Sequence, residues 1–315
     1  MDLLTPAAKW APAEASVPQA SDTREHAHAH GMPLAQRVTM FLSVVGPFVG
    51  FIGAVVLLWG RAVDWYDVPD VAKLKDSPEN DLIRYGHELI VDTAGQIGKN
   101  AKDADKRYAG NELACVNCHL NAGLQPFAAP FVSTFATFPM MVDDQVITLT
   151  ERINGCMRRS MNGQNLPVNS KEMEAMIAYM KYLGHDTPQG VRIAGMGLLS
   201  LQDPPSAADA ARGEQVYAKS CASCHKPDGQ GERKASPAVG YSIPPLWGDD
   251  SFNAGAGMAK LAYAASYIRA NMPFTIDYED PVLSLQQAWD VAAYMTSQKR
   301  PPAPPETGAE KTLPE

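Results

Sequence analysis

The chain has 315 residues, and its 35 acidic against 27 basic side chains give a formal net charge of −8 at pH 7. This acidic balance argues against a nucleic-acid-binding protein, whose phosphate-facing surface is positive. The length predicts more than one small domain rather than one large core. Five cysteines are present, and four of them fall into two matching groups.

Residues 1–39 are predicted to form a disordered cytoplasmic tail. Up to residue 36 the segment is rich in Ala, Pro and His and shows no apolar periodicity, a composition that does not build a packed core. Its HAHAH motif (26–30) offers imidazoles to a metal ion, but a short histidine tract in this setting is more typical of a solvated tail.

Residues 40–60 contain an uncharged apolar run, MFLSVVGPFVGFIGAVVLLW. At about 1.5 Å rise per residue, such a run is long enough to cross a hydrocarbon core roughly 30 Å thick, and we expect a single transmembrane anchor. A cleaved signal peptide is the alternative, which the long polar stretch in front and the missing A-x-A site behind disfavour. Residues 61–79 are expected to be a juxtamembrane linker.

Two segments, 80–186 and 209–300, repeat one plan, which predicts two tandem domains of the size of small cytochromes c. Each has a helical lead-in, a C-x-x-C-H motif, a loop rich in Gly and Pro, and a closing amphipathic helix. A proline-containing linker at 187–208 separates them, and a second disordered tail is expected at 301–315.

The C-x-x-C-H motif is the attachment signature of c-type haem. Its two thiols join the two vinyl groups of one porphyrin, and the following histidine reaches the iron as its proximal ligand. A redox dithiol or half a zinc site would explain one C-x-x-C, but not two copies that both continue with histidine. We therefore predict two covalently bound haem c groups, held by Cys115, Cys118 and His119 in the first domain and by Cys221, Cys224 and His225 in the second.

Haem c is attached on the outer side of an energy-transducing membrane, so the motifs also predict an orientation. The anchor would lie in the inner membrane as a single pass, with both haem domains in the periplasm. The expected fold is mostly α, with two tandem cytochrome c-type domains behind an N-terminal transmembrane helix. In the closing helix of the first domain, apolar side chains at helical spacing predict core packing: Met173, Met176, Ile177, Met180 and Leu183.

The iron of the second haem needs a sixth ligand, and Met272 is the expected one. It lies late in the domain and is followed directly by Pro273, as in the ligand loops of small cytochromes c. Met258 is the competing candidate, closer to the motif and without the proline. A His/Met pair raises the reduction potential and suits electron transfer.

Cys156, in the stretch RINGCMRRSMNG, is the expected sixth ligand of the first haem. A thiolate ligand lowers the reduction potential and also places a reactive sulfur beside an electron sink. The competing interpretations are a buried structural cysteine and ligation by a nearby methionine, which would be Met140, Met141, Met157 or Met161.

Basic residues surround Cys156 in the sequence. If the segment is helical, Arg152, Cys156, Arg159 and Ser160 fall on one face, although Gly155 weakens the helical prediction. Guanidinium groups favour an ionised thiol and bind oxyanions through charge-assisted hydrogen bonds. These four residues are therefore the catalytic candidates of a site for an anionic substrate.

Four stretches of the chain resemble the dihaem thiosulfate dehydrogenases, also called tetrathionate synthases. They are GNELACVNCHLNAG (110–123), TLTERINGCMRRSMNGQNLP (148–167), SKEMEAMIAYMKYLG (170–184) and IPPLWGDDSFNAGAGMAKLAYAASYIRANMPF (243–274). The resemblance implies that two thiosulfates couple to tetrathionate with release of two electrons. Cys156 would carry a covalent sulfur adduct that a second thiosulfate attacks, while Arg152, Arg159 and Ser160 would hold the sulfonate oxygens.

The resemblance also implies an electron path from the first haem to the second, and then to a cytochrome c or a terminal oxidase. In the family a lysine can accompany the distal methionine of the second haem; here that neighbour is Asn271, so no such ligand exchange is expected. The loop before TLTERIN departs from the family pattern, because Asp143 and Asp144 stand where basic residues are expected.

A second function is compatible with the same motifs: a non-catalytic, membrane-anchored dihaem electron-transfer subunit of a respiratory complex. An anchor favours this alternative, since tethering beside an oxidase raises the effective concentration. The arginines around Cys156 favour the enzyme, because an electron relay needs no anion site. We therefore expect the enzyme.

Overall fold

A computed structural model describes residues 34–59, 68, 70–142, 145–191, 193–274, 276 and 278–305, without the side chains at 36, 37 and 52–59. The greater part of the predicted tails (1–33 and 306–315), residues 61–67 of the predicted linker, and Asp143 and Asp144 lie outside the described residues. The chain divides into two units, Met1–Val63 and Asp64–Glu315.

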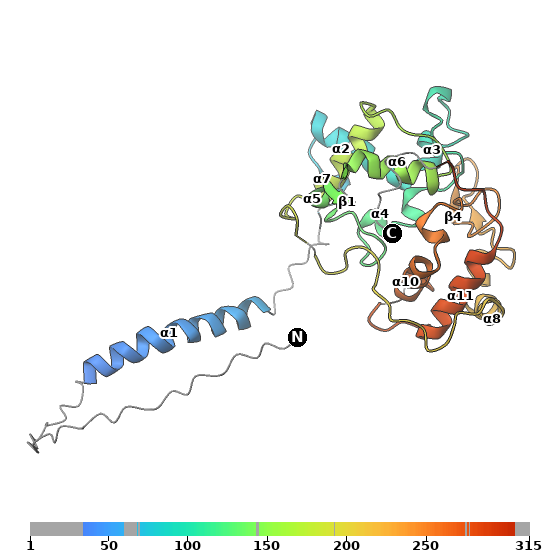
Figure 1. Cartoon of the computed structure of the whole chain (residues 1–315). Helices are drawn as coiled ribbons and strands as arrows, with labels where there is room; N and C mark the ends of the chain where they lie inside the picture. The colour runs from blue at the N-terminus through green and yellow to red at the C-terminus, as the bar shows by residue number, and fades with distance from the viewer. Residues whose placement is uncertain are drawn as a thin grey trace, which may run out of the picture. The chain divides into compact units, whose positions relative to one another are not determined.

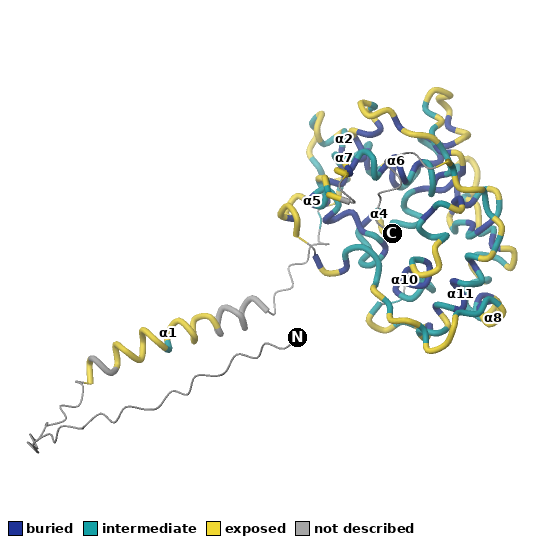
Figure 2. Tube along the Cα trace, viewed as in Figure 1, coloured by how far each residue is buried: buried dark blue, intermediate teal, exposed yellow. Residues whose placement is uncertain are grey.

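The first unit contains α1 (Leu34–Trp59), a single helix with Pro47 inside it (Figure 1). The residues of this helix whose burial is described are mostly exposed (Figure 2), and they include large apolar side chains such as Phe48 and Phe51. No helix in the described part of the chain is both long enough and apolar enough to cross a membrane. The transmembrane helix predicted at 40–60 therefore has no support from the described residues, which do not include the side chains of its second half.

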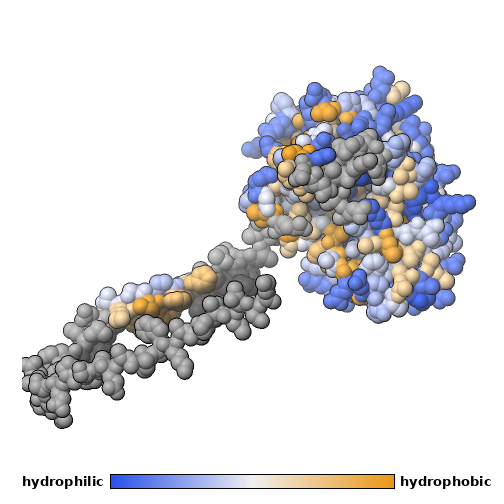
Figure 3. All heavy atoms as spheres, in the orientation of Figure 1, coloured by the Kyte–Doolittle hydropathy of each residue, from blue (hydrophilic) through white to orange (hydrophobic). Residues whose placement is uncertain are grey.

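The second unit is mostly helical, which confirms the mostly α part of the expected fold class. The face of this unit shown in Figure 3 is mainly hydrophilic. Its first half contains η1 (Val71–Lys73), α2 (Pro78–Val91), α3 (Thr93–Ile97), η2 (Ala104–Lys106), η3 (Cys115–Asn117), α4 (Leu120–Gly123), α5 (Thr134–Thr137), α6 (Leu149–Arg159) and α7 (Lys171–Leu183). Its second half contains α8 (Ala210–Ser220), α9 (Ala222–His225), η4 (Gly257–Ala259), α10 (Leu261–Asn271) and α11 (Leu285–Ser297).

The strands of the described residues form two short antiparallel pairs. In the first domain β1 (Met140–Val142) pairs with β2 (Gln145–Ile147), directly before α6. In the second domain β3 (Glu232–Arg233) pairs with β4 (Tyr241–Ile243) across an irregular register. Both pairs are too short to form a sheet that covers a core, so the helices carry the packing.

Helices α2 and α7 form the scaffold of the first domain. Ser77 and Ser170 cap their starts, each accepting a hydrogen bond from a backbone N–H of the first turn. The two helices cross at Gly86, where any Cβ would collide with the carbonyl of Ala175, so only glycine allows the backbones to touch. The methionines of α7 are buried, which confirms their predicted role in the core.

Helices α8 and α11 repeat this arrangement in the second domain, where Gly213 lies against the backbone carbonyl of Asp290. The Asp290 side chain is buried and accepts two hydrogen bonds from Arg212, both of 2.8 Å, and one from Gln286. Burial alone would raise the pKa of Asp290, but these hydrogen bonds outweigh it and hold the pKa below its ordinary value. The two domains thus share one helix-crossing plan, with an added ion pair in the second.

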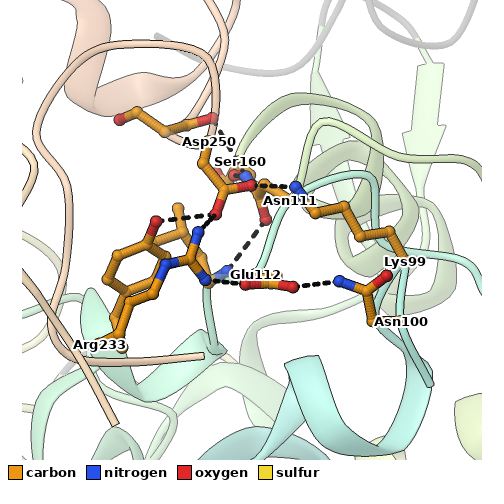
Figure 4. Close-up of polar contacts among 10 residues, drawn as sticks. Lys99, Asn100, Asn111, Glu112, Ser160, Arg233 and Asp250 are labelled. Atoms are coloured by element: carbon orange, nitrogen blue, oxygen red, sulfur yellow. Dashed lines mark hydrogen bonds and ion pairs between the residues drawn. The ribbon is translucent and has the colours of Figure 1, made fainter. Parts of the chain in front are cut away.

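A polar cluster joins the two domains on one side (Figure 4). Glu112 is buried and lies between Asn100 of its own domain and Arg233 of the second. Asp250 accepts hydrogen bonds from Lys99 at 2.5 Å and from Arg233 at 3.2 Å. Arg233 therefore bridges one carboxylate of each domain.

Helix α10 and the segment between the domains make further contacts across the boundary between the two domains. Tyr267 of α10 donates to the carbonyl of Cys118 at 3.0 Å, and Asn271 donates to the carbonyl of Phe127 at 3.1 Å. Residues 195–198, within the predicted linker, pair with the backbone of 127–129. The loop after the first haem motif is thus held by both later segments of the chain.

Candidate active site

Helix α6 carries most of the catalytic candidates, and its start is defined by a capping box. Thr148 accepts a hydrogen bond from the Glu151 N–H at 3.2 Å, and the Glu151 carboxylate accepts one from the Thr148 N–H at 2.7 Å. The predicted helix is therefore confirmed, with Gly155 buried inside it. A helix that begins at Leu149 places Arg152, Cys156 and Ser160 at intervals of four residues along one face.

This face of α6 closes a cavity of about 190 Å3. Arg152, Cys156 and Ser160 line it together with the first haem motif, Cys115, Cys118 and His119. The remaining lining is largely apolar and includes Ile90, Leu113, Phe131, Phe138, Leu149, Ile153, Met157, Met161, Met176 and Met180. An apolar cavity with two thiols, one imidazole and a few polar groups at one wall fits a c-type haem.

The sulfur atoms of this cavity lie close to one another. The pKa of Cys115 is raised to about 11 and that of Cys118 to about 12, chiefly by burial and in smaller part by the nearby Cys156. None of the three forms a disulfide. Thr93 positions the first of them, because its hydroxyl oxygen accepts from the Cys115 N–H at 3.0 Å. The thiols of the motif are thus available for attachment, and Cys156 is near enough to share their surroundings.

His119 is oriented for ligation. Its Nδ1 lies 2.7 Å from the carbonyl oxygen of Ala129, which identifies Nδ1 as the protonated nitrogen and leaves Nε2 free to bind a metal. The pKa of His119 is lowered to about 4, chiefly by burial and in smaller part by the charge of Arg152. The imidazole is therefore neutral at physiological pH, the form that binds a metal.

The other two arginines of this stretch point elsewhere. Arg158 donates to the side chain of Asn165 on the exposed face of α6. The described residues that line the cavity do not include Arg159, whose side chain lies close to Gly255 of the second domain. The structure therefore brings three of the four catalytic candidates together and places Arg159 at the domain boundary.

Two asparagines that sequence reasoning missed hold the end of α6. Asn253 of the second domain donates from its side chain to the carbonyl of Arg158 at 2.8 Å and from its backbone to that of Arg159 at 3.2 Å. Asn111 is fully buried and donates to the carbonyls of Ser160 at 2.9 Å and Ser251 at 3.2 Å. Neither has a sequence signal, because an isolated asparagine in a loop is most often a turn residue.

The second haem motif repeats the orientation seen in the first. His225 Nδ1 lies 3.0 Å from the carbonyl oxygen of Pro244, and burial lowers the pKa of His225. Cys221 is half-buried and Cys224 is exposed. Trp247 packs against Tyr217 at a ring distance of 5.1 Å, close to this motif. The donor set again fits a c-type haem, with Nε2 of His225 free for iron.

The two candidates for the distal ligand of this second haem lie on either side of α10. Met272 follows the helix directly and is half-buried. Met258 lies in η4, before the helix, and packs against the hydrophobic core. The prediction of Met272 over Met258 stays a prediction.

Two helical domains, each with a C-x-x-C-H motif and an oriented histidine, define a dihaem cytochrome c. Family models agree: residues 102–188 match the SoxA/TsdA cytochrome c domain, and residues 210–299 match cytochrome c. Both haem groups are covalently bound at these motifs.

Curated relatives cover most of both domains. The chain is 37% identical over 238 residues to a thiosulfate dehydrogenase of Thiomonas intermedia, covering 75% of this chain and 71% of the relative. It is also 37% identical over 242 residues to a thiosulfate dehydrogenase of Allochromatium vinosum, covering 74% and 84%. The chain belongs to the thiosulfate dehydrogenase family and is an oxidoreductase.

A solved structure shares the fold. The thiosulfate dehydrogenase (TsdBA) of Marichromatium purpuratum in its as-isolated form superimposes with a TM-score of 0.67 at 34% identity. The match covers 76% of this chain and 50% of that one, so this chain spans about half the length of the solved protein.

Proposed function

We propose that the chain oxidises thiosulfate to tetrathionate at the first haem and passes the electrons through the second haem to a cytochrome c or a terminal oxidase. The observation that carries the proposal is that Arg152, Cys156 and Ser160 line the same cavity as the first haem motif. A pure electron relay has no use for a guanidinium in this place. The names and identity of the relatives support the same substrate.

The chain's residues have the following roles in this proposal. Arg152 binds the sulfonate oxygens of thiosulfate through charge-assisted hydrogen bonds, and the Ser160 hydroxyl donates another. Arg159, at the end of α6, adds positive charge near this anion. His119 and Cys156 would hold the first iron. His225 and Met272 would hold the second, a pair that suits electron transfer, which is the chemistry that the haems would supply when bound.

Cys156 is the nucleophilic residue. In this proposal the Cys156 thiolate forms a bond to the sulfane sulfur of a first thiosulfate with loss of two electrons, which the haems, when bound, would accept. The sulfane sulfur of a second thiosulfate attacks the sulfur bound to Cys156, the bond to Cys156 breaks, and tetrathionate leaves. Charge balances, because two dianions give one dianion and two electrons. Covalent catalysis of this kind divides one difficult coupling into two easier steps.

An inner-membrane location with both haem domains in the periplasm is a further part of the proposal. It rests on the apolar run at 40–60 and on the compartment in which haem c is attached. Carbonate extraction of membranes from cells that express the full chain tests it. Haem-stained protein that stays in the pellet supports an anchor, and haem-stained protein in the wash contradicts one.

A titration of the purified, oxidised holoprotein with thiosulfate tests the reaction. The ferrous α-band reports haem reduction, and tetrathionate is assayed in the same samples, with a Cys156→Ala variant alongside. We expect both haems of the native protein to be reduced while tetrathionate accumulates, and the variant to show neither. If thiosulfate leaves the spectrum unchanged while a reduced cytochrome reduces both haems, the chain is an electron relay instead.

A further inference from the structure

Three buried side-chain polar atoms find no hydrogen-bond partner among the described residues: Ser133 Oγ, Arg269 Nη1 and Asn271 Oδ1. Folded proteins satisfy nearly all such atoms, so each of the three needs a partner that the described residues do not supply. Ser133 adjoins Thr134, which lines the cavity of the first haem. The other two lie in the last turn of α10, directly before Met272.

Of the two side chains on α10, Arg269 has the stricter requirement for a hydrogen-bond partner. A guanidinium is always charged and has donors only, so a buried Nη1 needs an acceptor, and an anion satisfies it best. Asn271 Oδ1 needs a donor instead, which an ordered water supplies. The side chain of Arg269 therefore marks an anion site that the described part of the chain does not fill.

The geometry of α10 shows which side of the helix this site faces. Tyr267 and Asn271 lie four residues apart and both donate to the first domain. Arg269 lies two residues from each, which turns it by about 160–200° around the helix axis. Its side chain therefore leaves α10 on the side opposite the first domain, three residues before the methionine proposed as ligand of the second iron.

We propose that Arg269 binds a propionate carboxylate of the second haem. A haem carries carboxylates that enter the protein with it, and planar carboxylates are matched by the fork of a guanidinium. The inference rests on the proposed function only in taking Met272 as the distal ligand, because this places the second haem beside the end of α10. The positive charge of Arg269 then favours the ferrous state of that haem and draws electrons from the first domain.

Spectroelectrochemical titration of both haems in the full-length holoprotein, at pH values from 5 to 9, tests the proposal. In Arg269→Gln we expect the midpoint potential of the second haem to fall and to become pH-dependent, because the released propionate titrates within this range. The first haem should keep its potential. Arg269→Lys retains the charge and should restore most of the native potential.

Arg300→Gln is the matched control. Arg300 belongs to the same domain and, like Arg269, is half-buried. Its guanidinium donates to the carbonyls of Leu246 and Met295, so its loss should leave the pH profile of the second haem native. The proposal is wrong if Arg269→Gln leaves the second haem unchanged, or if only the first haem responds. Haem content is measured on each variant to detect misfolding. If Arg269→Gln misfolds, the pH dependence of the second haem's midpoint potential in Arg269→Lys decides the test.

The potentials are set electrochemically, so the result does not depend on thiosulfate as the substrate. A chain that fails to oxidise thiosulfate can still show the expected response at Arg269. An unchanged potential combined with a higher KM for thiosulfate in Arg269→Gln would instead make the site one for substrate, which contradicts the propionate assignment.

Discussion

Arg152 and Arg158 lie on the same helix but meet different surroundings. Arg152 lines the cavity of the first haem and contributes to the low pKa of His119, whereas Arg158 faces outward and binds Asn165. One helix thus offers two chemically identical side chains, only one of which can contact a bound anion. This difference allows the role of the charge in the cavity to be separated from its effect on α6.

Replacing Arg152 by glutamine should lower kcat/KM for thiosulfate by about 100-fold, because it removes a charge-assisted donor from a largely apolar site. Steady-state reduction of an artificial electron acceptor measures this. Arg158→Gln, the same change on the same helix, should remain within about twofold of the native value. An equal loss in both variants would mean that the arginines act by stabilising α6 rather than by binding substrate.

At the scale of single elements, α6 is held at its two ends by different parts of the chain. Its start depends on a capping box between neighbouring residues, Thr148 and Glu151. Its end depends on Asn253, which belongs to the other domain. The position of Cys156 and Ser160 near that end is therefore set by an interdomain contact.

Asn253→Ala should lower the free energy of unfolding by about 1–2 kcal/mol, since the carbonyl of Arg158 at the end of α6 loses its side-chain donor. It should also lower kcat/KM for thiosulfate roughly tenfold, because the groups of the site are less well oriented. Chemical denaturation and steady-state kinetics measure the two effects. Asn165→Ala, which removes the exposed partner of Arg158 in the loop after the helix, should cost less than about 0.5 kcal/mol. A native kcat/KM in Asn253→Ala would show that the contact has no positioning role.

The α8–α11 pair predicts a specific pH dependence. The pKa of Asp290 is lowered in the folded state. Its ion pair with Arg212 therefore stabilises the fold fully above the ordinary carboxyl pKa of 3.8. This stabilisation is lost as the pH falls through the lower pKa of the folded state. Asp290→Asn should therefore be less stable than the native protein at pH 7. The difference should shrink below about pH 4, which denaturation at several pH values measures. A difference that stays constant with pH would contradict the assigned ion pair.

At the scale of the whole molecule, the second unit works as one body only if its two domains keep their relative position. The polar cluster of Figure 4 joins them through a buried carboxylate, Glu112, and a half-exposed guanidinium, Arg233. Helix α10 adds a direct bond from Tyr267 to the first haem motif. These contacts hold the two haem motifs in a fixed position relative to each other.

A double-mutant cycle on Glu112→Gln and Arg233→Gln should reveal this coupling. Each single change should lower the free energy of unfolding by about 1–2 kcal/mol, and the double change by clearly less than their sum, because the second substitution removes a partner that is already unpaired. Additive effects would mean that the two side chains do not interact. The Arg84→Gln variant, whose side chain pairs with Asp76 and Asp81 outside this cluster, should be additive with Glu112→Gln.

The contrast between sequence and structure follows the range of the contacts involved. The two haem motifs, the mostly helical class and the common face of Arg152, Cys156 and Ser160 are all readable from the sequence. Each depends on residues within a few positions of one another, where the chemistry of attachment and the period of a helix impose the pattern. The role of Arg159 in the same site stays a prediction. The local pattern does not reveal that the second domain lies beside its side chain, which the structure shows.

Only the tertiary structure determines how the two haem domains complete one another. The bond from Asn253 to Arg158 joins residues 95 positions apart, that from Asn111 to Ser251 spans 140 positions, and that from Tyr267 to Cys118 spans 149. No local periodicity records such pairs, because the partners meet only after both domains have folded. The same is true of Arg269, whose unsatisfied charge is visible only once its burial is known. The sequence alone therefore determined the cofactors and the helix that faces the first of them, while packing between the domains decided how that helix is held.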